Sequence, residues 1–450
     1  MDDINRELNN ALSMSAQSEI PDVILKSSVQ GTATDIAWYA TVYIEQSAGT
    51  WAQSAQADKR VGQDASSLFG NSWDQQYDVL MICKDIITKT EPGGAEPDNL
   101  FARGIAQLFT AYNLALLTDM WGEVPWTEAL QGAAVLQPKF DNQSTIYPKI
   151  QQYLDDAISS FTNATNVSGV GDYIYGGDVA SWIKAAYSLK ARYYMRLSVV
   201  EGNSACTSAL GIIANGLGQG ENFEFAAYEA SASGENPWYQ FLIDRTHLSV
   251  SQTLFNIMND RNDPRIPAYF TLIGGVYNPA PSGTAIEQQG GIYSTSLITE
   301  NGQTAPTPLM TYHELKFIEA EAKYRTGDGT WQASLQEAIA ANFAYHGVTG
   351  DSAYYADEVA PRLTTGNELT ELLTQKYIGF YEFEAIEAYN DYRRVPSFLT
   401  LNNPNNATTG FVWRFPYGLS EVSSNPDNVP DVNVFADKVW WAGGAELVSK

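Results

Sequence analysis

The sequence is poor in the residues that build metal centres and disulfide frameworks. It has only two cysteines, Cys83 and Cys206, which lie far apart and show no metal-binding or redox spacing. Each is expected to be a small buried thiol rather than half of a disulfide. The three histidines, His247, His313 and His346, have no second ligand-type residue at zinc spacing. We therefore expect no bound metal ion and no cofactor.

Positive charge is also scarce. The chain carries 26 Lys and Arg against 52 Asp and Glu, which gives a formal net charge of -26 at pH 7. Such a surface repels phosphate backbones and anionic lipids, so we expect no nucleic-acid partner and no polybasic docking on a membrane. The charge favours ligands that are neutral or cationic.

Long apolar runs and secretion signals are missing as well. The sequence has no stretch of about 18 apolar residues, so no membrane-spanning helix is expected. The first residues, MDDINRELNNALSMSAQ, lack the basic and apolar regions of a signal peptide. These residues alone leave two options open: an intracellular protein, or a mature chain without its leader.

Few signatures of catalysis are present. There is no GxSxG motif, and the glycine-rich segment NGLGQGEN lacks the Lys-Ser/Thr pair of a P-loop. The carboxylates that could supply an acid–base pair are Glu319, Glu321, Glu382, Glu384 and Glu387. Acidic residues at such helical spacings usually form a solvated face or pair with Lys and Arg. We therefore expect no catalytic residue.

Helical periodicity dominates what is present. Apolar residues recur at three- and four-residue steps in stripes that begin at Phe101, Ile146, Trp182, Leu315, Trp331 and Leu369. The segments 309–325 and 331–346 are joined by the short turn TGDGT, and Thr330 is the expected N-cap of the second. This pair looks like a tetratricopeptide-type repeat. The sequence predicts a mostly α fold, with tetratricopeptide-like helix pairs forming an α-α superhelical scaffold.

Long segments of different composition interrupt the helices. We expect one unit over 1–450, with a helical scaffold at about 20–200 and 309–395, a loop-rich ligand face at about 46–73 and 202–308, and a loop region at 396–450. Loops this long in a compact protein are usually functional or disordered. A rigid scaffold that presents aromatic-bearing loops is typical of a binding protein.

The segment LTDMWGEVPWTEAL, residues 117–130, predicts an abrupt helix end. Gly122 can adopt the left-handed conformation that ends a helix, and Pro125 prevents the helix from resuming. Trp121 and Trp126 flank the break, and the packing of these large rings is expected to hold a structural corner.

Two arginine-containing segments stand beside aromatic residues. DYRRVP occupies residues 391–396, and Arg414 lies within WRFPYG. An arginine among aromatic residues generally stacks on rings or caps carbonyls, so a structural role is expected for both segments.

Four elements together give the sequence a family resemblance. They are LTDMWGEVPWTEAL at 117–130, DYIYGGDVASWIKAAYSLKARYYMRLS at 172–198, NDPRIPAYF at 262–270, and EAYNDYRRVP at 387–396 combined with RFPYGLSEVSSN at 414–425. Because these four elements occur in this order along the chain, the sequence resembles the SusD/RagB family of outer-membrane nutrient-binding lipoproteins of Bacteroidetes. It is most similar to the SusD-like subgroup, in which RR-x-P precedes an R-x-PYP element. Here Gly418 replaces the second proline of that element.

The resemblance implies a fold with four tetratricopeptide-like helix pairs and a loop-rich ligand face. It also implies an exported lipoprotein at the surface of the outer membrane, anchored only through a lipidated N-terminal cysteine. That cysteine is absent, which fits a mature fragment. Such a protein captures oligosaccharide, or in some members peptide, and delivers it to a SusC-like TonB-dependent transporter without catalysis.

Aromatic residues in the loops are the candidates for the ligand site. Pyranose rings stack on Trp and Tyr while neighbouring polar side chains satisfy hydroxyl groups. The stacking candidates are Trp51, Trp238, Tyr239 and Tyr277, and the polar candidates are Asn236 and Arg245. Two or three such contacts correspond to affinities on the order of micromolar to millimolar.

Two other classes of protein remain open at this stage. An acidic all-α glycoside hydrolase would also be rich in aromatic residues, and it predicts two cleft carboxylates about 5–10 Å apart. An intracellular repeat scaffold predicts a concave surface without exposed Trp. A lipoprotein signal in the native gene would exclude the intracellular scaffold.

Overall fold

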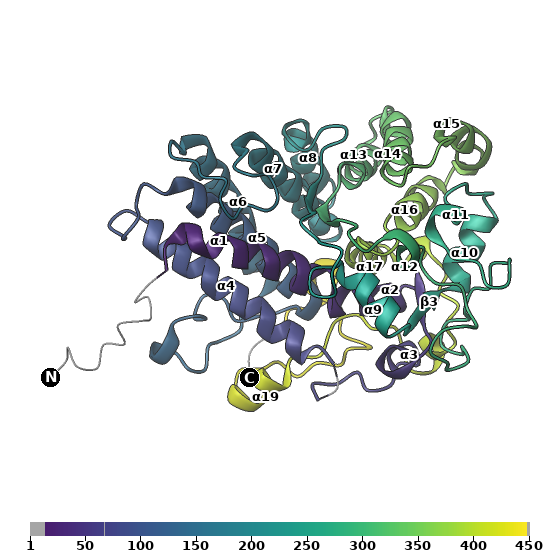
Figure 1. The fold of residues 1–450 in the computed structure, drawn as a ribbon, viewed down its shortest axis with the longest axis horizontal. Coiled ribbons are helices and arrows are strands. Elements are labelled where there is room, and N and C mark those ends of the chain that lie inside the picture. The colour runs from purple at the N-terminus through teal and green to yellow at the C-terminus, as the bar shows by residue number, and fades with distance from the viewer. Residues whose placement is uncertain (1–13, 67, 448–450) are drawn as a thin grey trace.

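Most of the chain is helical, as the periodicity predicts. The computed structural model describes residues 14–66 and 68–447, so the expectation about the first residues falls largely outside this part of the chain (Figure 1). The longer helices are α1 (Ala16–Leu25), α2 (Asp35–Tyr43), α4 (Gly70–Thr90), α5 (Leu100–Trp121), α6 (Gln143–Asn163), α7 (Val179–Arg196), α8 (Asn203–Ile212), α13 (Tyr312–Thr326), α14 (Trp331–Tyr345), α16 (Glu368–Gly379) and α17 (Ala385–Arg394). The mostly α fold is confirmed.

The long helices pack as a row of neighbours. Helix α4 contacts α5, α5 contacts α6, and the row continues through α7 and α8. Helix α8 then contacts α13, although a hundred residues separate them, and α13 packs on α14. Residues 213–311 therefore leave the row after α8 and return to it at α13.

The segments predicted as loops carry short elements of their own. Within 46–73 and 202–308 the structure has α3 (Ala52–Asp58), α9 (Pro237–Asp244), α10 (Gln252–Asn259), α11 (Ile266–Tyr269) and α12 (Ile298–Asn301). Helix α8 also falls within 202–308, although it belongs to the row of long helices and not to the loop-rich face. Strand β1 (Ser47–Gly49) pairs antiparallel with β3 (Leu248–Val250), with Ala48 opposite Ser249. Strand β2 (Phe223–Phe225) pairs antiparallel with β4 (Thr307–Met310). The first pairing attaches the long excursion to the N-terminal part of the chain, and the second joins the two ends of the excursion to each other.

The remaining short elements fill the connections. They are the π-helical turns Lys26–Thr32 and Tyr355–Val359, the short helices α15 (Asp351–Tyr354), α18 (Asn405–Thr408) and α19 (Leu419–Ser424), and the 3-10 turns Gly132–Ala134, Leu197–Val199, Ile213–Asn215, Ala360–Arg362, Pro396–Phe398 and Trp440–Ala442. The stripe that begins at Leu369 predicts one helix through Phe383, but α16 ends at Gly379 and α17 begins at Ala385. Glu382 has a φ of 71°, a backbone conformation that interrupts the helix between them.

Local capping explains several helix starts. The side chains of Asn99, Asp178 and Thr311 each accept a hydrogen bond from a backbone N–H in the first turn of α5, α7 and α13. Thr330 precedes α14 as expected, but its hydroxyl donates to Asp328 and does not cap the helix.

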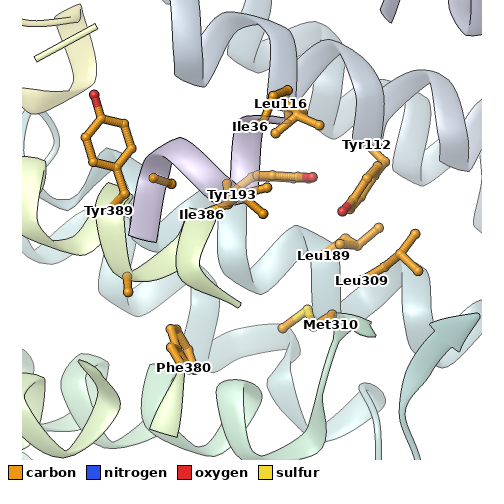
Figure 2. Packing of buried hydrophobic residues seen from close by; sticks show 14 of the residues in the cluster. Ile36, Tyr112, Leu116, Leu189, Tyr193, Leu309, Met310, Phe380, Ile386 and Tyr389 are labelled. Carbon is orange, nitrogen blue, oxygen red and sulfur yellow. The ribbon is translucent and has the colours of Figure 1, made fainter. Parts of the chain in front are cut away.

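Helix α5 is the central core helix. Among the described residues it alone is long and apolar enough to cross a membrane by length and composition, yet 89% of its most apolar stretch is buried inside the protein. It belongs to a large apolar cluster that also receives Ile36 from α2, Leu189 and Tyr193 from α7, and Met310 from β4 (Figure 2). Helices from both ends of the sequence therefore share one core.

An ionic network crosses this core. Arg192 on α7 forms two hydrogen bonds with the carboxylate of Glu314 on α13, and Arg196 one turn later pairs with Asp119 and Glu387. These side chains are almost fully excluded from solvent. A buried charge is tolerated only when it is paired and hydrogen-bonded, so the network fixes how α5, α7, α13 and α17 meet. Cys83 and Cys206 are buried free thiols, as expected.

His346, at the end of α14, is expected to make the protein acid-sensitive. Burial, and then the positive charges of His313 and Arg265, lower the pKa of His346 to about 3. The unfolded chain takes up a proton near pH 6.5 while the folded one stays neutral, so stability present above pH 6.5 is lost as the pH falls below it. The expected loss by pH 5 is about 1–2 kcal/mol in urea unfolding.

The His346→Phe variant provides the comparison. Its ring keeps contact with Tyr269 and Tyr345, whose rings lie 4.7 and 5.2 Å from that of His346. The difference in stability between pH 7 and pH 5 should shrink by the same amount in this variant. An unchanged difference would contradict the assignment to His346.

Candidate functional site

A cavity of about 620 Å³ is lined mainly by residues of α2, α3 and α9 and of the segments next to them. These three helices lie at the lower right of Figure 1. The cavity volume falls within the range of about 300–1,000 Å³ that is usual for small-molecule sites. The lining residues are Val29, Thr34, Asp35, Trp38, Tyr39, Gln53, Ser54, Ser233, Glu235, Pro237, Gln240, Phe241, Asp244, Arg245 and His247. We call it the α9 cavity, because α9 contributes more of its lining than any other helix.

Aromatic rings form one wall of the α9 cavity. Trp38 and Phe241 stack with ring centroids 3.9 Å apart and planes inclined by 13°. His247 meets Phe241 edge-on, with ring centroids 5.6 Å apart. The indole Nε1 of Trp38 is buried and has no hydrogen-bond partner within the described part of the chain. The wall is thus a fixed apolar platform of the kind on which a sugar ring stacks.

Acidic and neutral polar groups surround this wall. Burial raises the pKa of Asp35 at the start of α2, and its carboxylate forms no ion pair with any described residue. Burial, and then the positive charge of Arg245, lower the pKa of His247, so its imidazole is neutral at pH 7. A neutral imidazole has one donor and one acceptor nitrogen, which suits hydroxyl groups. Glu235 and Asp244 add two more carboxylates.

Buried contacts at the start of α9 hold the helix in place and thereby position the side chains that face the cavity. Asn236 is the N-cap: its side-chain oxygen accepts hydrogen bonds from the backbone N–H groups of Trp238 and Tyr239, and its amide donates to the carbonyl of Ala305. Trp238 is 1% exposed and packs in the core. The cavity residues Pro237, Gln240, Phe241, Asp244 and Arg245 follow the spacing i, i+3, i+4, i+7, i+8, which is one face of a helix.

Comparison with known proteins places the chain in a family. The family model SusD-like_2, described as starch-binding and associating with the outer membrane, matches residues 11–417. The chain belongs to this SusD-like family. A search of the curated proteins found no match for this SusD-like chain.

Solved structures agree with the SusD-like assignment. A SusD/RagB family protein from Bacteroides thetaiotaomicron VPI-5482 is 31% identical, with a TM-score of 0.87 over 96% of this chain and 100% of the other. A chitin-binding SusD homologue from Flavobacterium johnsoniae is 21% identical, with a TM-score of 0.81 over 96% and 99% of the two chains. A further chitin-binding protein is 23% identical, with a TM-score of 0.80 over 96% and 100%. These last two share the fold.

The structure places some of the predicted ligand residues of this SusD-like protein at the α9 cavity and others away from it. Arg245 is exposed and lines the α9 cavity. Trp51, which is 39% exposed, precedes the cavity residues Gln53 and Ser54. Strand pairing brings it close, because the N–H of Thr50 donates to the carbonyl of His247.

The other candidates do not line the cavity. Trp238 and Asn236 are buried, so the prediction that they contact ligand directly does not fit this structure; they hold α9 in place instead. Tyr239 is half-buried against the core, and Tyr277 packs on Phe255 with ring centroids 5.7 Å apart.

Sequence reasoning missed the aromatic wall and the acidic residue beside it. Trp38, Phe241, His247 and Asp35 were not among the predicted site residues, although a signal for Phe241 was available. Arg245 lies four residues after Phe241, and residues at that spacing share a helix face. The choice of Arg245 therefore already implied Phe241.

Proposed function

We propose that this SusD-like protein binds oligosaccharide at the surface of the outer membrane and delivers it, unaltered, to a SusC-like TonB-dependent transporter. The observation that carries the proposal is the stacked Trp38–Phe241 wall within a cavity of about 620 Å³. The family description names starch-binding and association with the outer membrane, and two structural relatives are chitin-binding, which supports a glycan as ligand. Trp51 and Arg245 are proposed to extend this site.

Non-catalytic binding is supported by what three of the five candidate carboxylates contact. Glu321 is buried and Glu387 is largely buried, and both are paired with arginines, while Glu384 is hydrogen-bonded to His313 and Thr311. A carboxylate held this way serves the fold and is not placed to protonate a glycosidic oxygen.

The Phe241→Ala variant tests the site. Removing the ring is expected to lower affinity for the bound glycan about two- to tenfold, because one aromatic stacking contact is worth about 0.5–1.5 kcal/mol. A glycan array that includes maltohexaose and chitohexaose selects the ligand, and calorimetry compares the affinities. In cells that carry the partner transporter, the same variant is expected to slow uptake of that glycan.

Tyr173→Ala is the matched control. Tyr173 is 50% exposed and lies outside the α9 cavity, so its removal should leave affinity unchanged. Wild-type affinity in Phe241→Ala would reject the cavity as the site. Release of reducing ends from the glycan during incubation would instead reject non-catalytic binding.

A further inference from the structure

The two tryptophans of the 117–130 corner have different environments. Trp121 is fully buried, and its Nε1 donates to the carbonyl of Pro416 at 2.8 Å, so packing accounts for it completely. Trp126 is only half-buried and lines a second cavity of about 460 Å³. Packing within the corner therefore explains why Trp121 is present, but it does not explain the partly exposed ring of Trp126.

This second cavity, which we call the corner cavity, is a groove between α4 and α6. Helix α4 contributes Lys84, Ile87 and Thr88, and Glu91 follows its end; α5 contributes Thr110, the loop after α5 contributes Trp126, Thr127, Ala129, Leu130 and Gln131, and α6 contributes Lys149 and Tyr153. The rings of Trp126 and Tyr153 meet at 77° with centroids 5.8 Å apart, which forms an angled aromatic wall. Helices α4 and α6 lie at the left of Figure 1 and α9 at the lower right, so the two cavities are separate.

The loop that carries Trp126 is held rigidly. The carboxylate of Asp141 accepts hydrogen bonds from the backbone N–H groups of Trp126 and Thr127, at 2.9 and 2.7 Å, and from the hydroxyl of Thr127. Leu130 adopts a φ of 59°, an uncommon conformation for a residue with a side chain, and Lys84 donates a hydrogen bond to its carbonyl. A strained, pinned loop keeps the Trp126 ring in place before any ligand arrives.

The charge of the corner cavity is opposite to that of the whole chain. Acidic residues outnumber basic ones two to one in the sequence, but the cavity contains two lysines and one glutamate. Lys149 is exposed, and no hydrogen bond or ion pair joins its ammonium group to any described residue. An unpaired ammonium group beside an aromatic wall suits a sugar that carries an anionic group.

We propose that the corner cavity binds a pyranose bearing a carboxylate or sulfate group. The sugar ring packs against Trp126 and Tyr153, and its anionic group faces Lys149. The site is independent of the α9 cavity, whose lining carries three carboxylates against one arginine.

The test is calorimetry with trigalacturonate and with a sulfated carrageenan tetrasaccharide, each compared with uncharged galactotriose at low and high salt. We expect at least one anionic probe to bind more tightly than galactotriose. Tyr153→Ala should weaken that binding about tenfold and Lys149→Ala about threefold, and the Lys149 effect should shrink at high salt. Lys139→Ala, which removes the same charge from the nearby exposed surface, should change little.

The outcomes separate this proposal from the glycan site at α9. Phe241→Ala should leave binding of the anionic probe intact. The corner site is overturned if neither anionic probe exceeds galactotriose, if Tyr153→Ala and Lys149→Ala bind like the wild type, or if Phe241→Ala alone abolishes binding.

Discussion

Replacing Glu321 by glutamine is expected to lower the free energy of unfolding by about 3–5 kcal/mol. Glu321 is fully buried on α13, and its two oxygens accept hydrogen bonds from both terminal nitrogens of Arg394, each at 2.7 Å. Arg325 donates a third at 2.8 Å. Glutamine keeps the shape but removes the charge, which leaves the buried guanidinium group of Arg394 with less compensation in a dry interior.

The electrostatics of the site explain the size of this effect. Burial raises the pKa of Glu321, but the positive charges of Arg394 and Arg325 outweigh it, and the pKa lies well below its usual range. The carboxylate therefore stays ionised in the folded protein throughout the physiological range. Its contribution to stability is present above the ordinary glutamate pKa and is lost as the pH falls below it.

Glu337→Gln is the matched control for urea unfolding. Glu337 lies on the neighbouring helix α14 and pairs with Lys316, but its side chain is 50% exposed. Solvent screens such a pair, so the expected loss is about 1 kcal/mol or less. Equal losses of unfolding free energy in Glu321→Gln and Glu337→Gln would show that burial does not determine how strongly the ion pairs of Glu321 stabilise the fold.

Gly122→Ala is expected to destabilise the corner by about 3 kcal/mol. Gly122 ends α5 with φ 85° and ψ -118°, a region that only glycine enters readily, at a cost of about 1–3 kcal/mol for other residues. An added Cβ would lie 2.7 Å from Cζ of Arg414. That guanidinium group is fully buried and hydrogen-bonded to Glu123 and Tyr417, so moving it breaks further contacts.

Gly132→Ala measures the backbone part of this loss alone. Gly132 also has a positive φ of 56°, but an added Cβ would meet nothing within 4 Å. Its replacement should cost about 1 kcal/mol in thermal or urea unfolding. If Gly122→Ala and Gly132→Ala were equally stable, the close approach of Arg414 to position 122 would add nothing to the loss of stability.

The corner was predictable from sequence because its signals are local. Gly122, Pro125 and the flanking rings define the helix end within a few residues, and α5 ends at Trp121 as expected. Arg393, Arg394 and Arg414 are buried and bonded to carbonyls and carboxylates, which confirms their structural role. Gly418, where the family pattern has proline, keeps a φ of -62°, a value that proline itself adopts, so the turn tolerates the substitution.

The ligand site was harder to predict because it depends on which face of α9 is buried. Asn236 and Pro237 mark the start of that helix clearly, but Trp238 and Phe241 lie only three residues apart and are neighbours on its surface, and yet Trp238 packs in the core while Phe241 lines the cavity. The choice between them is made by segments distant in sequence, since Ala305 anchors the N-cap and Trp38 stacks on Phe241. Sequence spacing contains no information about those partners.

The return of the chain from α8 to α13 has a consequence for how such proteins diversify. Strands β2 and β4 pair near the two ends of the 213–311 excursion, so the two ends of this loop are held together by backbone hydrogen bonds. Lengthening a loop that is already closed costs little entropy, because the penalty grows only with the logarithm of its length. Insertions at the exposed turns of the excursion, which carries α9, can therefore add recognition groups while the scaffold on either side stays the same.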